Sequence, residues 1–277
     1  DLFGETLAGT PWGVAGALPS ALATLGIGRL AMGRYAQRFQ DPLLRAAFPL
    51  LEYSLPEAPM FMHLAKHAYG MRGGIRWPVG ASLAFARSIE RTYLDLGGEI
   101  RYASRVAKIQ VRDDRACGVR LEDGTEIPAD VVISDADGRK TIRDLLDGRY
   151  MDDTLRAWCG DPPDEGPWAV HVFLGVERDL SREPSALVLL LDEPATIAGH
   201  TLSSLEMQTY GMDPTMAPPG HGVIKVELVS KWSYWNALAA DRARYDEEKA
   251  RVVDQVLDVL ERRWPGIRAD VRAVDVP

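Results

Sequence analysis

The stretch "GGEIRYASRVAKIQVRDDRACGVRLEDGTEIPADVVISDAD", residues 97–137, decides the fold class of this chain. Its alternation of apolar and polar residues predicts strands over 105–112 and 116–122, paired as a hairpin around Asp113-Asp114. The letters "TEIP" predict a further short strand. The nearly all-apolar run at 131–134 then predicts a strand that is buried on both faces of a parallel sheet.

The segments on either side of this stretch set the wider pattern. Upstream, "LAFARSIERTYLDLGG" predicts an amphipathic helix whose C-terminal cap is the glycine pair. The first seventy residues are also helical in character, and a helix is predicted to begin at Asp41-Pro42. Downstream, "WAVHVFLGV", "ALVLLLDEP" and "GVIKVELVSKWSYW" predict strands, and "DEEKARVVDQVLDVLERRW" predicts an amphipathic helix. The first part is an α/β pattern, and the last indicates an antiparallel α+β layer.

Composition limits the class of protein. The 277 residues suffice for one large domain or two ordinary ones, and 46% hydrophobic with 26% charged residues is typical of a soluble globular protein. A net charge of −8 disfavours binding to nucleic acid. Cys117 and Cys159 lack the spacing of a zinc site or a disulfide scaffold.

No stretch reaches the roughly 20 apolar residues that span a bilayer, and no signal peptide is evident, so we expect a soluble, cytoplasmic chain. The start without Met indicates an internal piece of a longer protein.

Three short patterns favour structural roles over functional ones. Gly26–Ala31 matches the dinucleotide fingerprint G-x-G-x-x-A, but the residues before it are helix-like and no acidic strand end follows, which favours a chance match. His63 and His67 have metal-ligand spacing without the glutamate of H-E-x-x-H or a third ligand. The aromatic "KWSYW" favours core packing or the wall of an apolar ligand site over nucleic-acid stacking.

Asp135 and Asp137 follow the predicted buried strand at 131–134. Open α/β sheets bind their ligands at this end of their strands. Asp137 could equally cap the next helix, so the sequence leaves both interpretations open.

The segment "GGIRWPVGASLAFARSIERTYLDLGGEIRYASRVAKIQVRDDRACGVRLEDGTEIPADVVISDAD" resembles the middle of the phytoene desaturase and carotenoid isomerase-like flavoproteins, within the monoamine-oxidase-like superfamily. The resemblance rests on the order of its motifs: G-G-x-x-x-P-x-G, an amphipathic helix, G-G-x-I, V-x-x-I, G-V-x-L-x-D-G and A-D-x-V-I-S-x-A-D. Later text such as "VLERRWPGI" extends it to most of the chain.

The resemblance implies a partial FAD/NAD(P)-binding, Rossmann-like sheet joined to a substrate domain with helices and an antiparallel or mixed sheet. It assigns residues 1–72 to the helical part of the substrate domain, residues 73–147 to the returning segment of the FAD-binding domain, and residues 148–277 to the sheet of the substrate domain with its covering helix.

The resemblance also implies site residues. The strand beginning at Val106 lays its main chain against the adenine of FAD, and the strand end with Ser134, Ala136 and Asp137 approaches the cofactor. Gly74 and Trp77, in the loop from Gly73 to Gly80, approach the flavin ring. No catalytic side chain and no metal site can be named.

The implied activity is that of an FAD-dependent oxidoreductase that desaturates, isomerises or otherwise oxidises an apolar, isoprenoid-like small molecule. Contact with a membrane surface through the substrate domain is compatible with such a substrate, and the oligomeric state stays open. The alternatives are a non-catalytic binding domain of the same fold and an amine-oxidase-type flavoenzyme. The family's N-terminal G-x-G-x-x-G unit is missing, so we expect this chain alone to retain no FAD.

Overall fold

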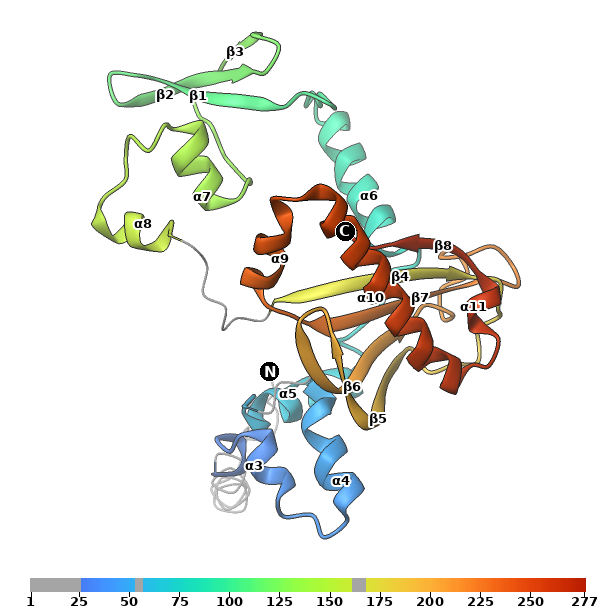
Figure 1. Cartoon of the computed structure of the whole chain (residues 1–277). Coiled ribbons are helices and arrows are strands. Elements are labelled where there is room, and N and C mark those ends of the chain that lie inside the picture. The colour runs from blue at the N-terminus through green and yellow to red at the C-terminus, as the bar shows by residue number, and fades with distance from the viewer. Residues whose placement is uncertain (1–25, 53–56, 161–167) are drawn as a thin grey trace, which may run out of the picture. The chain divides into compact units, whose positions relative to one another are not determined.

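The computed structural model describes residues 26–52, 57–160 and 168–277. They divide into two compact units (Figure 1). The sheet unit comprises the residues before Ala86 and those after Gly166, and the hairpin unit comprises Ala86–Gly166. No helix in these ranges is long and apolar enough to cross a membrane.

A five-stranded antiparallel sheet forms the centre of the sheet unit, in the order β5-β6-β7-β4-β8. The sequence predicts β4, β5 and β7 but misses β6 and β8. The strand β6 returns from β5 through a tight turn in which Ala198 and Gly199 both have positive φ, 51° and 71°. The five strands are β4 (Ala169–Val176), β5 (Ala186–Ile197), β6 (His200–Thr209), β7 (Gly222–Val229) and β8 (Val271–Asp275).

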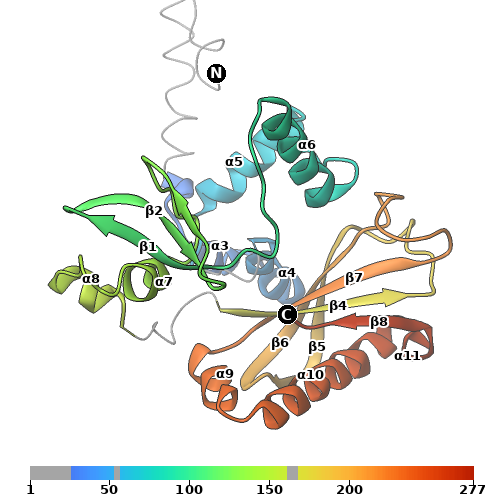
Figure 2. The same ribbon diagram turned by 90° about the horizontal axis from the view of Figure 1, so that it is seen from above.

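One face of this sheet carries the main hydrophobic core, and α10 (Arg242–Arg263) runs along it (Figure 2). Alternate residues of β7, among them Val226, are fully buried beside Val256 and Leu260 of the helix. The prediction of an amphipathic helix here is confirmed. The "KWSYW" aromatics do not extend β7: the strand ends at Val229, and these aromatics lie in α9 (Trp232–Ala239). The short helix α11 (Ile267–Asp270) follows α10.

Among the described residues before Gly73, the sheet unit contains the helices α3 (Met32–Ala36), α4 (Pro42–Ala47), the 3-10 helix η1 (Phe48–Glu52) and α5 (Met60–Met71). Asp41 caps α4 as expected, since its carboxylate accepts hydrogen bonds from the amides of Leu43 at 2.7 Å and Leu44 at 3.0 Å. Gly26 to Gly28 are helical, which agrees with a chance match to the dinucleotide fingerprint.

The hairpin unit contains a three-stranded antiparallel sheet, β1 (Val106–Arg112), β2 (Arg115–Leu121) and β3 (Glu126–Pro128). The predicted hairpin is confirmed, with Asp113 and Asp114 at φ 49° and 58° in the turn. The predicted helix is α6 (Ala81–Asp95), which is followed by Gly97 at φ 88°. Short helices follow: α7 (Gly138–Lys140), the π-helix η2 (Thr141–Leu145) and α8 (Asp153–Trp158).

The prediction of a buried strand at residues 131–134 is wrong for this chain. The segment pairs with no strand among the described residues, and the exposed fractions of Val131 and Ile133 are 73% and 89%. A strand that is apolar on both faces needs a paired neighbour on each side and layers that cover it. The small sheet of the hairpin unit ends at β3 and provides neither.

Candidate functional site

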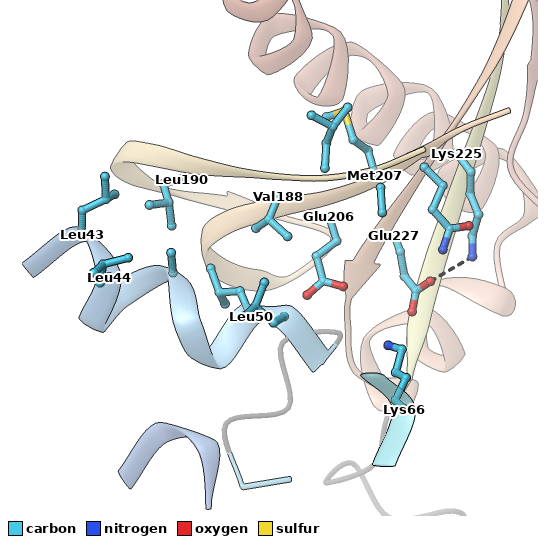
Figure 3. A pocket seen from close by; sticks show the side chains of 15 residues that line it. Leu43, Leu44, Leu50, Lys66, Val188, Leu190, Glu206, Met207, Lys225 and Glu227 are labelled. Carbon is cyan, nitrogen blue, oxygen red and sulfur yellow. Dashed lines mark hydrogen bonds and ion pairs between the residues drawn. The ribbon is translucent and has the colours of Figure 1, made fainter. Parts of the chain in front are cut away.

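A cavity of about 560 Å³ lies in the sheet unit, between the second face of the five-stranded sheet and the helices α4, η1 and α5. Leucines of α4 and η1 point toward Val188 and Leu190 of β5 (Figure 3). These apolar side chains are largely uncovered, with exposed fractions of 62% for Leu43 and 41% for Leu190. The two facing walls therefore form an apolar slot at one end of the cavity.

The floor of the cavity changes from apolar to charged across the sheet. Strand pairing places Val188 opposite Glu206, Glu206 opposite Glu227, and Glu227 opposite His171. Side chains of a strand alternate between its two faces, so this row shares the face that does not join the core. From β5 to β4, this row therefore passes from an aliphatic side chain to three ionisable ones.

The charged end of the cavity combines acidic and basic groups. The Nζ of Lys225 donates to the Oε2 of Glu227 at 2.9 Å, and the Nε2 of His171 lies 3.4 Å from the same oxygen. Lys66, on α5, points its ammonium group toward Glu206 and Glu227 (Figure 3). Like charges that face each other across a strand pair are destabilising, and these ammonium groups offset that repulsion.

A buried carboxylate anchors the loop from Gly73 to Gly80. The Oδ2 of Asp213 accepts hydrogen bonds from the Nε1 of Trp77 at 2.9 Å and from the amide of Gly80 at 3.0 Å. The hydroxyl and the amide of Thr215 donate to its other oxygen at 2.6 and 3.0 Å. The bonds from Thr215, followed by that from Trp77, hold the pKa of Asp213 far below its ordinary value of 3.8.

This anchored loop is connected to the charged end of the cavity. The indole of Trp77 lies against the ring of Tyr210, with ring centroids 5.5 Å apart. The hydroxyl of Tyr210 donates to the Oε1 of Gln208 at 3.1 Å, and Gln208 lines the cavity. Burial raises the pKa of Tyr210, so this hydroxyl stays protonated at neutral pH.

Gly74, the other predicted residue of this loop, packs closely against Tyr69. A Cβ at Gly74 would lie 2.5 Å from the Tyr69 ring, and the amide of Gly74 donates to the carbonyl of Tyr69 at 3.0 Å. The glycine is therefore required for local packing. Trp77, by contrast, remains 44% exposed.

The hairpin unit holds the remaining predicted residues. Val106 lines a groove of about 320 Å³ whose other lining residues are both polar and apolar: Glu99, Arg101, Ser104, Val119, Leu121 and Ile127. Asp137 caps α7, since its Oδ1 accepts from the amide of Lys140 at 2.9 Å. The helix-cap interpretation of Asp137 is thus confirmed.

Near this cap, the Ser134 and Thr141 hydroxyls lie 2.8 Å apart, and Ala136 is exposed. The structure therefore brings Ser134, Ala136 and Asp137 together at the start of α7.

His63 and His67 lie on one side of α5, with ring centroids 4.4 Å apart. In the parts of the chain that the structure describes, no group of three or more His, Cys, Asp or Glu side chains could hold a metal ion. His63 is buried and its ring contacts Phe48, which favours a packing role for this side chain.

Sequence reasoning missed Glu206, Lys225, Glu227, Lys66 and Asp213. The alternation in "GVIKVELV" places Lys225 and Glu227 on one face of a strand, which is a usable signal. It gives no information about what lies opposite, because Glu206 belongs to the strand that was not predicted.

Comparisons with known proteins place these features in context. The family model described as flavin containing amine oxidoreductase matches residues 19–274. Prolycopene isomerase 2, chloroplastic, from an Oncidium hybrid cultivar is 28% identical over 214 residues, which are 72% of this chain and 34% of that protein. The lycopene-forming phytoene desaturase of Pseudescherichia vulneris is 28% identical over 247 residues, which are 84% of this chain and 49% of that protein.

The structural comparison supports the fold. The crystal structure of an oxidoreductase from Methanosarcina mazei matches with a TM-score of 0.50 and 20% identity, over 72% of this chain and 42% of that one. The chain therefore spans between about a third and a half of the length of these relatives.

Proposed function

The chain belongs to the flavin-containing amine oxidoreductase family, and from this premise we propose that the whole protein is an FAD-dependent oxidoreductase acting on an apolar, isoprenoid-like substrate. The two enzymes compared above are named for an isomerisation of prolycopene and a desaturation of phytoene. Their similarity to this chain supports an elongated apolar molecule as the substrate.

The observation that carries the proposal is the cavity of the sheet unit. Its volume of about 560 Å³ lies within the range of small-molecule sites, about 300–1,000 Å³. Exposed leucines on one wall face exposed Val188 and Leu190 on the other. Covering such a surface with a hydrocarbon is favourable by about 25 cal/mol of free energy per Å² of apolar area. These walls therefore favour the binding of an apolar ligand over water.

The residues of the chain fit part of an FAD molecule. When bound, FAD supplies the hydride-accepting chemistry of the reaction. We propose that the main chain at Val106 holds the adenine, because the groove beside it offers the apolar side chains of Val119, Leu121 and Ile127 to a planar ring. Gly74 and Trp77 would hold the loop against the flavin, and Ser134, Ala136 and Asp137 would border the cofactor. Asp213 then acts as a positioning residue, since it fixes the Trp77 loop.

The test uses the full-length protein, purified with its flavin. We would measure the oxidation or isomerisation of an isoprenoid polyene by absorbance, in wild type and in Val188→Asp. The charge in the apolar wall should raise KM about tenfold or more while leaving flavin content unchanged. Thr201→Asp, at an exposed position of β6 outside the cavity, is the matched control. Equal KM values in both variants would place the substrate elsewhere.

The same preparation separates the two alternatives. A full-length protein that carries no flavin would be a non-catalytic binding domain. A flavoprotein that is reduced by primary amines and not by polyenes would be an amine oxidase.

We also propose that the sheet unit contacts a membrane surface. Leu43, Leu44 and Leu51 at the helical wall of the cavity have exposed fractions of 62%, 53% and 53%, and a lipid surface is where an apolar substrate would be stored. Sedimentation with phospholipid vesicles should recover the full-length protein, and Leu43→Ser with Leu44→Ser should reduce the recovered fraction. Recovery that does not change in this variant would contradict the proposed contact.

A further inference from the structure

We propose that the charged end of the cavity recognises a hydroxyl or carbonyl group at one end of the substrate. The substrate class is then an isoprenoid with a neutral polar terminus and not a plain hydrocarbon. This inference rests on the proposed function of the cavity as the substrate site, and it adds a specificity site formed by Glu206, Lys225, Glu227 and Lys66.

The strand register places two glutamates side by side, and keeping them there requires the compensating ammonium groups of Lys66 and Lys225. Glu206 and Glu227 face each other directly on neighbouring strands, an arrangement that destabilises a sheet when both carry charge. Neither side chain is needed for the core, which lies on the other face of the same strands. Two apolar residues at these positions would extend the slot that Val188 and Leu190 begin.

Lys225 and Glu227 are partly buried, so they need hydrogen-bond partners inside the cavity. The side chains of Lys225 and Glu227 are only 15% and 33% exposed, so the cavity supplies much of their remaining contact with water. A hydrocarbon that filled the cavity would remove that water, so the donor and acceptor positions that the Lys225–Glu227 bond does not use would lose their hydrogen bonds, at a cost of about 1–3 kcal/mol for each one. A ligand with a polar end would replace the water.

The charges at this end indicate a neutral ligand group. Two lysines, Lys66 and Lys225, stand with two glutamates, Glu206 and Glu227, so their formal charges cancel. Because these charges cancel, neither a ligand carboxylate nor a ligand ammonium gains a net attraction that would offset its loss of hydration. A hydroxyl both donates and accepts hydrogen bonds, so it can bond to a carboxylate and to an ammonium group together.

The position of this end adds a direction to the binding mode. Gln208 lines the cavity beside Lys225 and is bonded to Tyr210, against which Trp77 lies. The leucine walls lie at the other end, on β5 and α4. The polar terminus of the ligand therefore lies on the side of the Trp77 loop, and its hydrocarbon chain extends along β5.

The test compares matched isoprenoid probes on the full-length flavoprotein. Equilibrium dialysis would measure the dissociation constants of farnesol, farnesene and farnesoic acid, which share one carbon skeleton. Wild type should bind farnesol about tenfold more tightly than farnesene, because a hydrogen bond to a charged group contributes about 1.5–3 kcal/mol. Farnesoic acid should bind more weakly than farnesol.

Glu206→Leu should remove the preference for the alcohol, while Glu193→Leu, the same change at an exposed position of β5 outside the cavity, should keep it. Lys225→Met is the second variant if Glu206→Leu fails to fold. Equal binding of alcohol and hydrocarbon by wild type would overturn this inference and leave the proposed function intact. Failure of all three probes to bind would overturn the proposed substrate cavity and this inference with it.

Discussion

Single residues of this chain connect segments that lie far apart in the sequence. The carboxylate of Asp213 receives a hydrogen bond from Trp77, 136 residues earlier. It also receives bonds from Gly80 and from both donor groups of Thr215, so all of its strong acceptor positions are used. One acidic side chain thus fixes both a turn after β6 and the loop that leads into α6.

Replacing Trp77 with phenylalanine tests this anchor. The variant keeps an aromatic ring against Tyr210 and loses the donor to Asp213. We expect the melting temperature of the full-length protein to fall by about 2–4 °C, the usual shift for the loss of about 1 kcal/mol in a domain of this size. Trp158→Phe, at a tryptophan that is 51% exposed, is the control and should have little effect. An unchanged melting temperature in Trp77→Phe would contradict the anchoring role.

The pH dependence of stability tests the charge on Asp213. Its pKa is lowered by folding, so its contribution is fully present above the ordinary value of 3.8 and is lost progressively as pH falls from there through the lower pKa of the folded state. Wild type should therefore exceed Asp213→Asn in melting temperature at about pH 6, and this difference should shrink toward about pH 3. A difference that stays constant across this range would mean that the carboxylate charge does not stabilise the fold.

The elements that the sequence predicted correctly are those specified by local signals, such as turn residues and apolar periodicity. The turn of the β1–β2 hairpin was predictable because Asp-Asp tolerates the left-handed conformation that the turn needs. The helix α10 was predictable from its periodic apolar residues. Both signals are local, and both survive whatever surrounds the segment.

The charged end of the cavity was not predictable in the same way. It depends on the register between β6 and β7, and β6 has serine, glutamate and glutamine on its cavity face where an apolar pattern would have marked a strand. Residues 131–134 show the opposite error. Their apolar run is a valid strand signal, but a strand forms only where neighbours pair with it.

The turn of the β1–β2 hairpin offers a test of local geometry. Asp113 has φ 49°, a conformation that costs a β-branched residue about 1–2 kcal/mol. Asp113→Val should therefore destabilise the full-length protein by about that amount in chemical denaturation, and Asp113→Gly should leave stability equal or slightly higher. Equal stabilities of the valine and glycine variants would show that the turn does not hold this conformation in solution.

At the scale of the whole molecule, apolar residues of the hairpin unit lack cover. Val131 and Ile133 are 73% and 89% exposed. Ile89, in the middle of α6, and Leu96, directly after it, are 57% and 83% exposed. We expect the full-length protein to cover residues 131–134. Their amide hydrogens should exchange slowly in the full-length protein and rapidly in the 277-residue chain, measured by mass spectrometry. Rapid exchange in both would mean that the segment remains unpaired.

The last prediction concerns the cofactor. We expect the isolated 277-residue chain to purify without FAD, while the full-length protein retains it. The pyrophosphate of FAD needs amide groups at a helix N-terminus, and the glycines from Gly26 to Gly28 are helical and form no such turn. Contacts near Val106 and Ala136 alone must overcome an association cost of about 4–15 kcal/mol.

Absorbance spectra of the two purified proteins would give their flavin contents, and added FAD should leave the melting temperature of the isolated chain unchanged. Stoichiometric flavin in the isolated chain would contradict the prediction. That result would mean that a segment of these 277 residues other than the glycines from Gly26 to Gly28 binds the pyrophosphate.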